Sequence, residues 1–202
     1  MAEFLRINLN QLIEQVGEDK TKSILSSFSC PKNIDVQEFL RSKAIQFSKM
    51  GLAKTHLIFW YEKDNPIELA GYFAIASKFF TVSKGAVSKT TIKKISQYGN
   101  YSPDMQKYVI AAPLIAQLGK NYAGGNNYLI SGDELLKMAV EKVKEIQNEI
   151  GGKFTYLECE DVEYLKQFYS NNGFREFGKR ELDRDETDLK GKYLIQFLKY
   201  IH

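Results

Sequence analysis

The 202-residue chain has few histidines and cysteines, and this scarcity limits its chemistry. The only histidines are His56 and His202, so no nucleophile has an obvious histidine base and no Cys/His cluster has metal-ligand spacing. We therefore expect no metal, and acid–base chemistry must use tyrosine, carboxylates, water or backbone groups. Cys30 and Cys159 lie far apart in apolar surroundings, which predicts two reduced, buried thiols.

Long apolar runs and a strong charge of one sign are also missing. No apolar stretch could span a bilayer, and the first residues show no basic-then-apolar secretion pattern. A net charge of +3, with 44% hydrophobic and 26% charged residues, is typical of a folded soluble protein. This charge permits nucleic acid as a partner without requiring it. We expect a cytoplasmic protein, with no membrane partner, folded as one domain over residues 1–202.

The spacing of hydrophobic residues predicts a series of helices and strands. No internal repeat or linker divides the sequence. Helices are expected at 11–16, 35–50, 134–150 and 161–172, and strands at 55–62, 67–76, 107–118, 154–159, 174–178 and 193–200. Asp35 and Glu38 predict a capping box for the second helix, and Pro113 predicts a bulge or interruption in its strand. A lysine-rich insert at about 80–108, with a short helix at 89–97, interrupts the sheet. This order predicts an α/β (α+β) fold, a mixed sheet with helices on both faces.

The run from Leu165 to Phe174 reads L-x-x-F-Y-x-x-x-G-F, the last turns of an amphipathic helix stopped by a glycine. It resembles the acetyl-CoA-binding core of the GNAT N-acetyltransferase superfamily. The resemblance implies a mostly antiparallel central sheet with a splayed central strand pair, and acetyl-CoA as cosubstrate. It also implies that Tyr169, on the final helical turn, protonates the departing thiolate. Without the full string, the pair Phe168-Tyr169 would be read as core packing.

The loop that precedes the helix at 134–150 completes the resemblance. Ser131 and Glu134 predict a capping box, and a helix N-terminus after a glycine-containing loop offers free N–H groups to a pyrophosphate. The family motif Q/R-x-x-G-x-G/A falls on Asn127, Ile130 and Gly132, so only its last glycine is kept. The resemblance implies a cofactor-binding set, with the pantetheine arm at the first three positions: Leu118, Gly119, Lys120, Asn127, Leu129, Ile130, Ser131, Gly132, Asp133, Phe168 and Tyr169.

Attack by an amine also needs a base, directly or through water. Glu158, at the end of its strand, is the first candidate, and Glu68 on the hairpin is the alternative. For each, a solvated carboxylate at the rim of the sheet is the competing interpretation. The predicted catalytic residues are therefore Tyr169 and Glu158.

The resemblance implies an acyltransferase that moves an acetyl group from acetyl-CoA to a primary amine by direct attack. Two alternatives stay open. One is a toxin-type enzyme that acetylates aminoacyl-tRNA, and the other is a noncatalytic CoA-binding or scaffold domain. The insert lysines are read first as a solvated surface, because contiguous aromatic or arginine readers of nucleic acid are missing. The acceptor is not identified by any residue, and a homodimer is left open.

Overall fold

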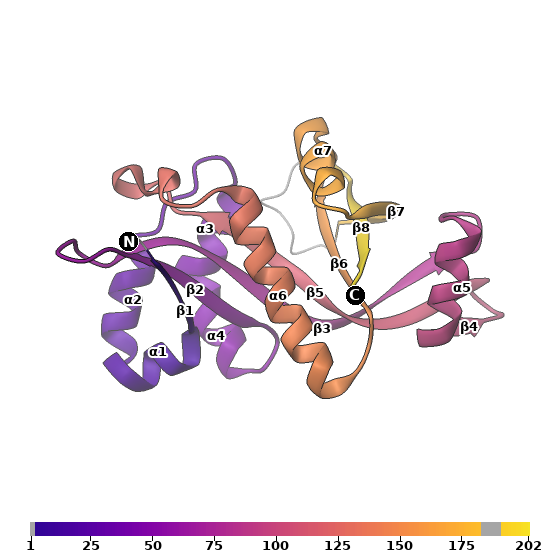
Figure 1. The fold of residues 1–202 in the computed structure, drawn as a ribbon, viewed down its shortest axis with the longest axis horizontal. Helices are drawn as coiled ribbons and strands as arrows, with labels where there is room; N and C mark the ends of the chain where they lie inside the picture. Colours follow the sequence, from indigo (N-terminus) through magenta and orange to yellow (C-terminus); the bar gives the residue numbers. More distant parts are fainter. Residues whose placement is uncertain (1–2, 183–190) are drawn as a thin grey trace. The chain divides into compact units, whose positions relative to one another are not determined.

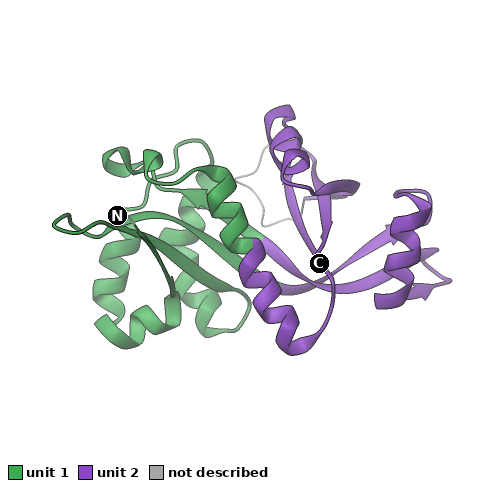
Figure 2. Cartoon of the chain, viewed as in Figure 1, with its two compact units in different colours: residues 1–76, 116–139 green, residues 77–115, 140–202 purple. Residues whose placement is uncertain are grey.

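The computed structural model describes residues 3–182 and 191–202, which form two compact units, each built from two separate segments (Figure 2). The first unit comprises residues 1–76 and 116–139, and the second comprises residues 77–115 and 140–202. Three elements pass from one unit into the other, namely β3 (Glu68–Ser83), β5 (Lys107–Lys120) and α6 (Gly132–Ile150) (Figure 1). The single domain expected over residues 1–202 stays a prediction.

The first unit begins with a strand and two helices that the sequence only partly revealed. Its elements are β1 (Glu3–Asn8), α1 (Leu9–Val16), α2 (Glu18–Ser26), α3 (Ile34–Glu38), a π-helical turn (Phe39–Lys43), α4 (Ala44–Lys49) and β2 (Lys54–Tyr61). β1 and α2 were not expected. β2 and β3 pair antiparallel, which confirms the predicted hairpin, with a bulge at Ile58/Phe59.

The expected helix at 35–50 is present, but it starts differently. Asn33 is the N-cap, and its side chain accepts a hydrogen bond from the Val36 N–H at 3.1 Å. The Asp35 capping box is therefore wrong: the Asp35 carboxylate instead accepts a hydrogen bond from Gln117 Nε2 at 2.9 Å. These helices cover a core of fully buried side chains that includes Leu9, Leu25, Phe28, Leu40, Leu57 and Tyr72.

The second unit contains the insert and the C-terminal strands. Its remaining elements are α5 (Lys89–Tyr98), β4 (Asn100–Ser102), β6 (Phe154–Glu160), α7 (Glu163–Asn171), β7 (Arg175–Glu181) and β8 (Tyr193–Tyr200). The helix expected at 89–97 is confirmed as α5. The insert begins later than expected, since β3 continues to Ser83 with Phe80 and Val82 buried. Part of the charged tip between β7 and β8 lies outside the described residues.

The strands of the described chain form one sheet, hydrogen-bonded in the order β1-β2-β3-β5-β6-β8-β7, with β4 paired to β5. The pairs β1–β2, β2–β3, β4–β5, β6–β8 and β7–β8 are antiparallel. β5 and β6 are parallel and pair at Leu114–Tyr156 and Ile115–Leu157. β5 runs through Pro113 as one strand, so the strand is not interrupted there, while the alternative expectation of a bulge stays a prediction. The mixed, mostly antiparallel sheet predicted from the sequence is confirmed.

The apolar face of α6 packs into the core. Leu135, Leu136, Ala139 and Val143, which recur at helical spacing, are all buried. Within residues 3–182 and 191–202, no helix has the length and apolar character needed to cross a bilayer.

Candidate functional site

The end of α7 explains the roles of Tyr169, Gly173 and Phe174 in the L-x-x-F-Y-x-x-x-G-F string. The Phe174 N–H donates to the Tyr169 carbonyl at 3.1 Å, and the Gly173 N–H donates to the Ser170 carbonyl at 3.0 Å. These two bonds form a Schellman motif, in which Gly173 takes the left-handed backbone (φ +78°). The Phe174 ring contacts the Tyr169 ring at 6.2 Å, the apolar contact that accompanies this cap. Phe168, one residue earlier, is part-exposed and accepts a side-chain hydrogen bond through its carbonyl.

The Tyr169 side chain sits in an aromatic environment within the second unit. Its ring centroid lies 5.9 Å from that of Phe197 on β8, and the residue is half-buried. Burial, with smaller contributions from Cys159 and Tyr164, raises the pKa of the Tyr169 hydroxyl well above its ordinary value. The phenol therefore keeps its proton at neutral pH and can donate it, but it cannot act as a base.

Glu158 is firmly held rather than solvated. Its side chain is 11% exposed, and its two oxygens accept hydrogen bonds from Arg180 Nε at 2.6 Å and from Gln196 Nε2 at 2.8 Å. The guanidinium and amide donors fix the position of the carboxylate. Glu158 is therefore not the solvated rim charge that was the competing interpretation. Its role as a base stays a prediction.

Glu68, the alternative base, lies in the first unit at the start of β3. It is partly buried and accepts a hydrogen bond from Asn126 Nδ2 at 3.0 Å. One of its oxygens thereby ties the hairpin to the loop after β5. This contact gives Glu68 a structural task that does not depend on catalysis.

An asparagine that the sequence analysis did not single out anchors the start of that loop. Asn121 is 2% exposed, and its N–H and Nδ2 donate to the Ala70 and Leu69 carbonyls at 2.8 and 2.9 Å. Its Oδ1 accepts from the Ser29 and Ala123 N–H groups at 3.0 and 3.1 Å. The bond to Ala123, two residues on, is an Asx turn, which an asparagine directly after an apolar strand could have indicated.

The loop continues as a 3₁₀ turn at Ala123–Tyr128 that contains two left-handed glycines. Gly124 and Gly125 have φ of +61° and +83°, so the chain reverses here without side-chain strain. Lys120 Nζ donates to the Asn127 carbonyl at 2.6 Å and ties the end of β5 to the loop. The side chain of Lys120, a residue predicted to contact the cofactor, is thus hydrogen-bonded to the backbone of the loop.

The N-terminus of α6 has the predicted capping box. The Glu134 N–H donates to Ser131 Oγ at 3.1 Å, and the Ser131 N–H donates to Glu134 Oε2 at 2.8 Å. The bonds from Ser131 lower the pKa of Glu134, so this carboxylate stays ionised and turned back toward the cap. Gly132 and Asp133 open the first turn, where N–H groups point away from the helix, while Ile130 is buried and Leu129 is partly buried.

Gly119 has a packing reason as well as a proposed binding role. A Cβ built on it would lie 2.4 Å from Val36 Cγ1 and 3.3 Å from the Phe28 and Tyr72 rings. A Cβ on Gly71 would meet the Gly119 carbonyl at 2.8 Å, so β3 and β5 approach each other where both lack side chains. The strand at Leu118–Lys120 is therefore positioned by the first unit's own core.

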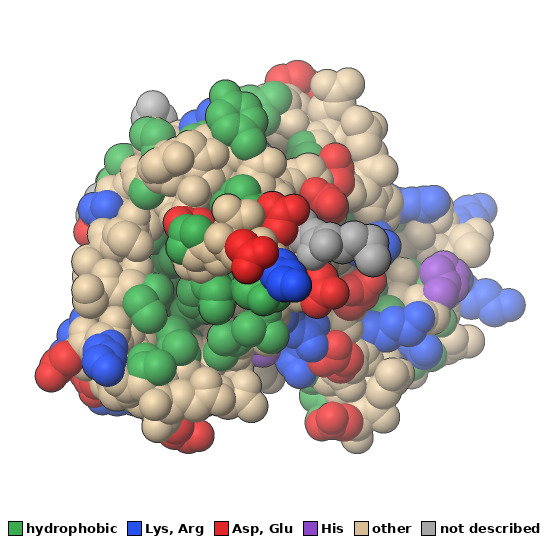
Figure 3. Space-filling model, turned by 60° about the vertical axis from the view of Figure 1, so that its left-hand side comes forward, with side chains coloured by type: hydrophobic (Ala, Val, Ile, Leu, Met, Phe, Trp, Pro, Cys, Tyr) green, Lys and Arg blue, Asp and Glu red, His purple; other side chains and the backbone are tan. Residues whose placement is uncertain are grey.

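The structure gathers the expected residues into two groups. Residues 118–120 and 127–133, with Glu68, belong to the first unit; Glu158, Phe168 and Tyr169 belong to the second. No group of His, Cys, Asp and Glu suited to a metal ion occurs among the residues that the structure describes. Figure 3 shows basic and acidic side chains scattered around a cluster of hydrophobic ones on the face drawn.

Comparison with known proteins gives fold likeness without sequence likeness. No family model matches the chain, and no curated protein matches it. A tyrosine-to-phenylalanine mutant of KacT superposes with a TM-score of 0.63 at 15% identity, covering 97% of this chain and 95% of that one. AtaT complexed with acetyl-methionyl-tRNAfMet gives 0.61 at 17% identity, covering 96% and 94%. AtaTR bound with AcCoA gives 0.55 at 12% identity, covering 98% and 93%. These likenesses confirm the GNAT-like fold expected from the sequence.

Proposed function

We propose that the chain is an acetyl-CoA-dependent N-acetyltransferase of the toxin type, whose acceptor is the amino group of an aminoacyl-tRNA. The observation that carries this choice of acceptor is the fold shared, over nearly the whole of both chains, with AtaT solved with acetyl-methionyl-tRNAfMet. A general primary-amine acetyltransferase was the first expectation from the sequence, and the neighbours favour the tRNA acceptor over it.

We expect main-chain groups rather than side chains to bind acetyl-CoA. The first-turn N–H groups of α6 at Gly132 and Asp133 would hold the CoA pyrophosphate, since a helix N-terminus carries partial positive charge. The backbone at Leu118–Lys120 would pair with the pantetheine arm. Because these contacts use main-chain groups, Asn127 and Ile130 can replace the family's usual residues without removing them.

The chemical step is a direct attack. The neutral amine forms a bond to the thioester carbon, the C–S bond breaks, and the CoA thiolate takes the Tyr169 proton. The amine proton leaves through Glu158, Glu68 or water, and solvent reprotonates the phenolate. Holding both reactants in line supplies much of the rate.

Acetyl-CoA with charged and uncharged tRNA, assayed for release of free CoA thiol, tests the function. We expect thiol release with charged tRNA only. Transfer to small amines but not to charged tRNA would return the function to the general acetyltransferase. Acetyl-CoA binding without any turnover would support a noncatalytic CoA-binding domain, the alternative that the altered Asn127 and Ile130 positions favour.

The remaining expectations are proposals as well. A cytoplasmic location accords with acetyl-CoA and tRNA as substrates. We keep the homodimer and the single domain over residues 1–202, with its insert, as expectations that size-exclusion chromatography and limited proteolysis would test.

A further inference from the structure

The segment 77–115, which contains the insert and the adjoining ends of β3 and β5, concentrates the positive charge of the chain. Residues 77–115 contain six lysines and one aspartate, with no arginine or glutamate, a net charge of +5. The whole chain carries +3, so the remainder is slightly acidic. Such an asymmetry within one chain points to a polyanionic partner. The six lysines are Lys78, Lys84, Lys89, Lys93, Lys94 and Lys107.

Aromatic side chains accompany these lysines in space, although the sequence does not place them together. Lys94 Nζ lies 4.0 Å from the centroid of the Tyr200 ring on β8, and Lys84 Nζ lies 4.4 Å from that of Tyr101. Tyr98 on α5 and Tyr200 on β8 also lie beside each other within the second unit. The fold thus places aromatic rings beside these lysines, although aromatic residues are not contiguous with them in the sequence.

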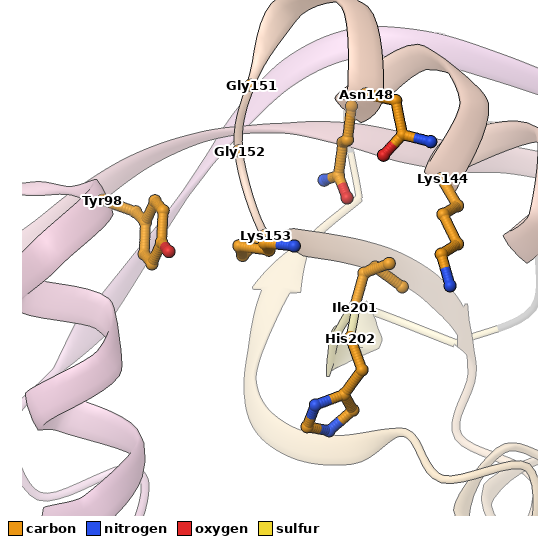
Figure 4. Close-up of a pocket in the computed structure, with 9 residues that line it drawn as sticks. Tyr98, Lys144, Asn148, Gly151, Gly152, Lys153, Ile201 and His202 are labelled. Carbon is orange, nitrogen blue, oxygen red and sulfur yellow. The ribbon is translucent and has the colours of Figure 1, made fainter.

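A pocket opens beside this surface, entirely within the second unit (Figure 4). It has a volume of about 190 Å³, and its lining includes Tyr98, Lys144, Lys153 and His202. Figure 4 shows Tyr98 approaching from α5 on one side and Lys144 from α6 on the other. The lining has two lysines and two aromatic rings and no aspartate or glutamate side chain. None of these residues belongs to the proposed acetyl-transfer machinery.

We propose that this pocket binds one nucleotide of an RNA chain and that the α5 lysines continue the contact along its phosphates. Lys144 and Lys153 would neutralise the phosphate, and the Tyr98 and His202 rings offer faces on which an unstacked base can stack. An acidic peptide would use the lysines but not the rings. The inference rests on the proposed function, because it names a tRNA-docking surface for that enzyme.

The test measures tRNA binding by fluorescence anisotropy at several salt concentrations. Lys144→Gln combined with Lys153→Gln should weaken binding and reduce the slope of log K against log salt by about one unit for each phosphate that the variant no longer neutralises. The matched control is Lys20→Gln with Lys63→Gln, two exposed lysines of the first unit, which should change neither quantity. Tyr98→Phe should bind like the parent, whereas Tyr98→Ala should lose roughly five- to a hundredfold in affinity if a base stacks there.

Separate readouts distinguish this inference from the proposed function. If the parent acetylates charged tRNA and the pocket variants bind tRNA as the parent does, the inference is wrong and the function stands. If the pocket variants lose tRNA binding but the parent acetylates no charged tRNA, the function is wrong and the RNA surface stands. Equal binding of a polyglutamate peptide, or binding of AMP with no loss of tRNA affinity in the variants, would also overturn the RNA surface. Melting temperatures confirm that each variant is folded.

Discussion

Replacing Gly119 with alanine should overpack the core of the first unit. The new Cβ would lie 2.4 Å from Val36 Cγ1, too close for any real contact, and the surrounding Phe28 and Tyr72 side chains are fully buried and cannot yield easily. Overpacking of this kind costs about 1–3 kcal/mol. For a chain of this size the melting temperature should fall by roughly 2–12 °C. Acetyl-CoA affinity should fall too if the Leu118–Lys120 backbone holds pantetheine.

Val36→Ala tests the cause directly, because it removes the atom that clashes. Alone it should cost about 1.6 kcal/mol for the two carbons removed. Together with Gly119→Ala it should cost little more than it does alone, so the two changes should be strongly non-additive in a double-mutant cycle. The Tyr72 hydroxyl donates to the Val36 carbonyl at 2.5 Å, and Val36→Ala keeps this main-chain acceptor. Gly85→Ala, where nothing lies within 4 Å, is the control and should be neutral. Simple additivity, or a Gly119→Ala melt matching the control, would refute the packing argument.

Four further changes probe the two groups of site residues. Tyr169→Phe should lower turnover by about 10²–10⁴-fold while acetyl-CoA Kd and melting temperature stay near normal; unchanged kcat, with chemistry rate-limiting, would leave Tyr169 a packing residue. Glu158→Gln should lower kcat by about 10²–10⁴-fold if Glu158 is the base, and the same loss in Glu68→Gln instead would favour the alternative. Ser131→Ala should cost about 1 kcal/mol. The pKa of Glu134 is lowered in the folded protein, so its ionised carboxylate adds to the free energy of unfolding above the unfolded-state pKa, and this contribution is lost as pH falls through the folded-state pKa. Ser131→Ala should therefore make the free energy of unfolding, measured by urea titration at several pH values, fall less steeply in acid.

The features predicted correctly from the sequence are those formed by residues that lie close together along the chain. The Ser131–Glu134 capping box and the glycine stop of α7 each depend on side chains or backbone angles no more than five residues apart. Both were predicted and both are confirmed.

The predictions that were wrong concern features that depend on residues far apart in the sequence. Asn33 takes the cap of α3, and Asp35 is turned to Gln117, 82 residues away, a partner that no local pattern reveals. β3 continues past the polar residues Ser77 and Lys78 because Phe80 and Val82 are buried in the core of the second unit. The hydropathy of this segment alone does not show that burial. The hydrogen bonds of Glu158 likewise join three strands, so no local pattern predicts them.

The central claim is tested most directly by incubating the protein with radiolabelled acetyl-CoA and tRNA charged with one amino acid, then cleaving the ester and identifying the labelled product. The account predicts label in the N-acetyl amino acid, none with uncharged tRNA, and a rate about 10²–10⁴-fold lower for Tyr169→Phe. Label in the RNA itself, or no transfer by a protein that binds acetyl-CoA and charged tRNA, would contradict it.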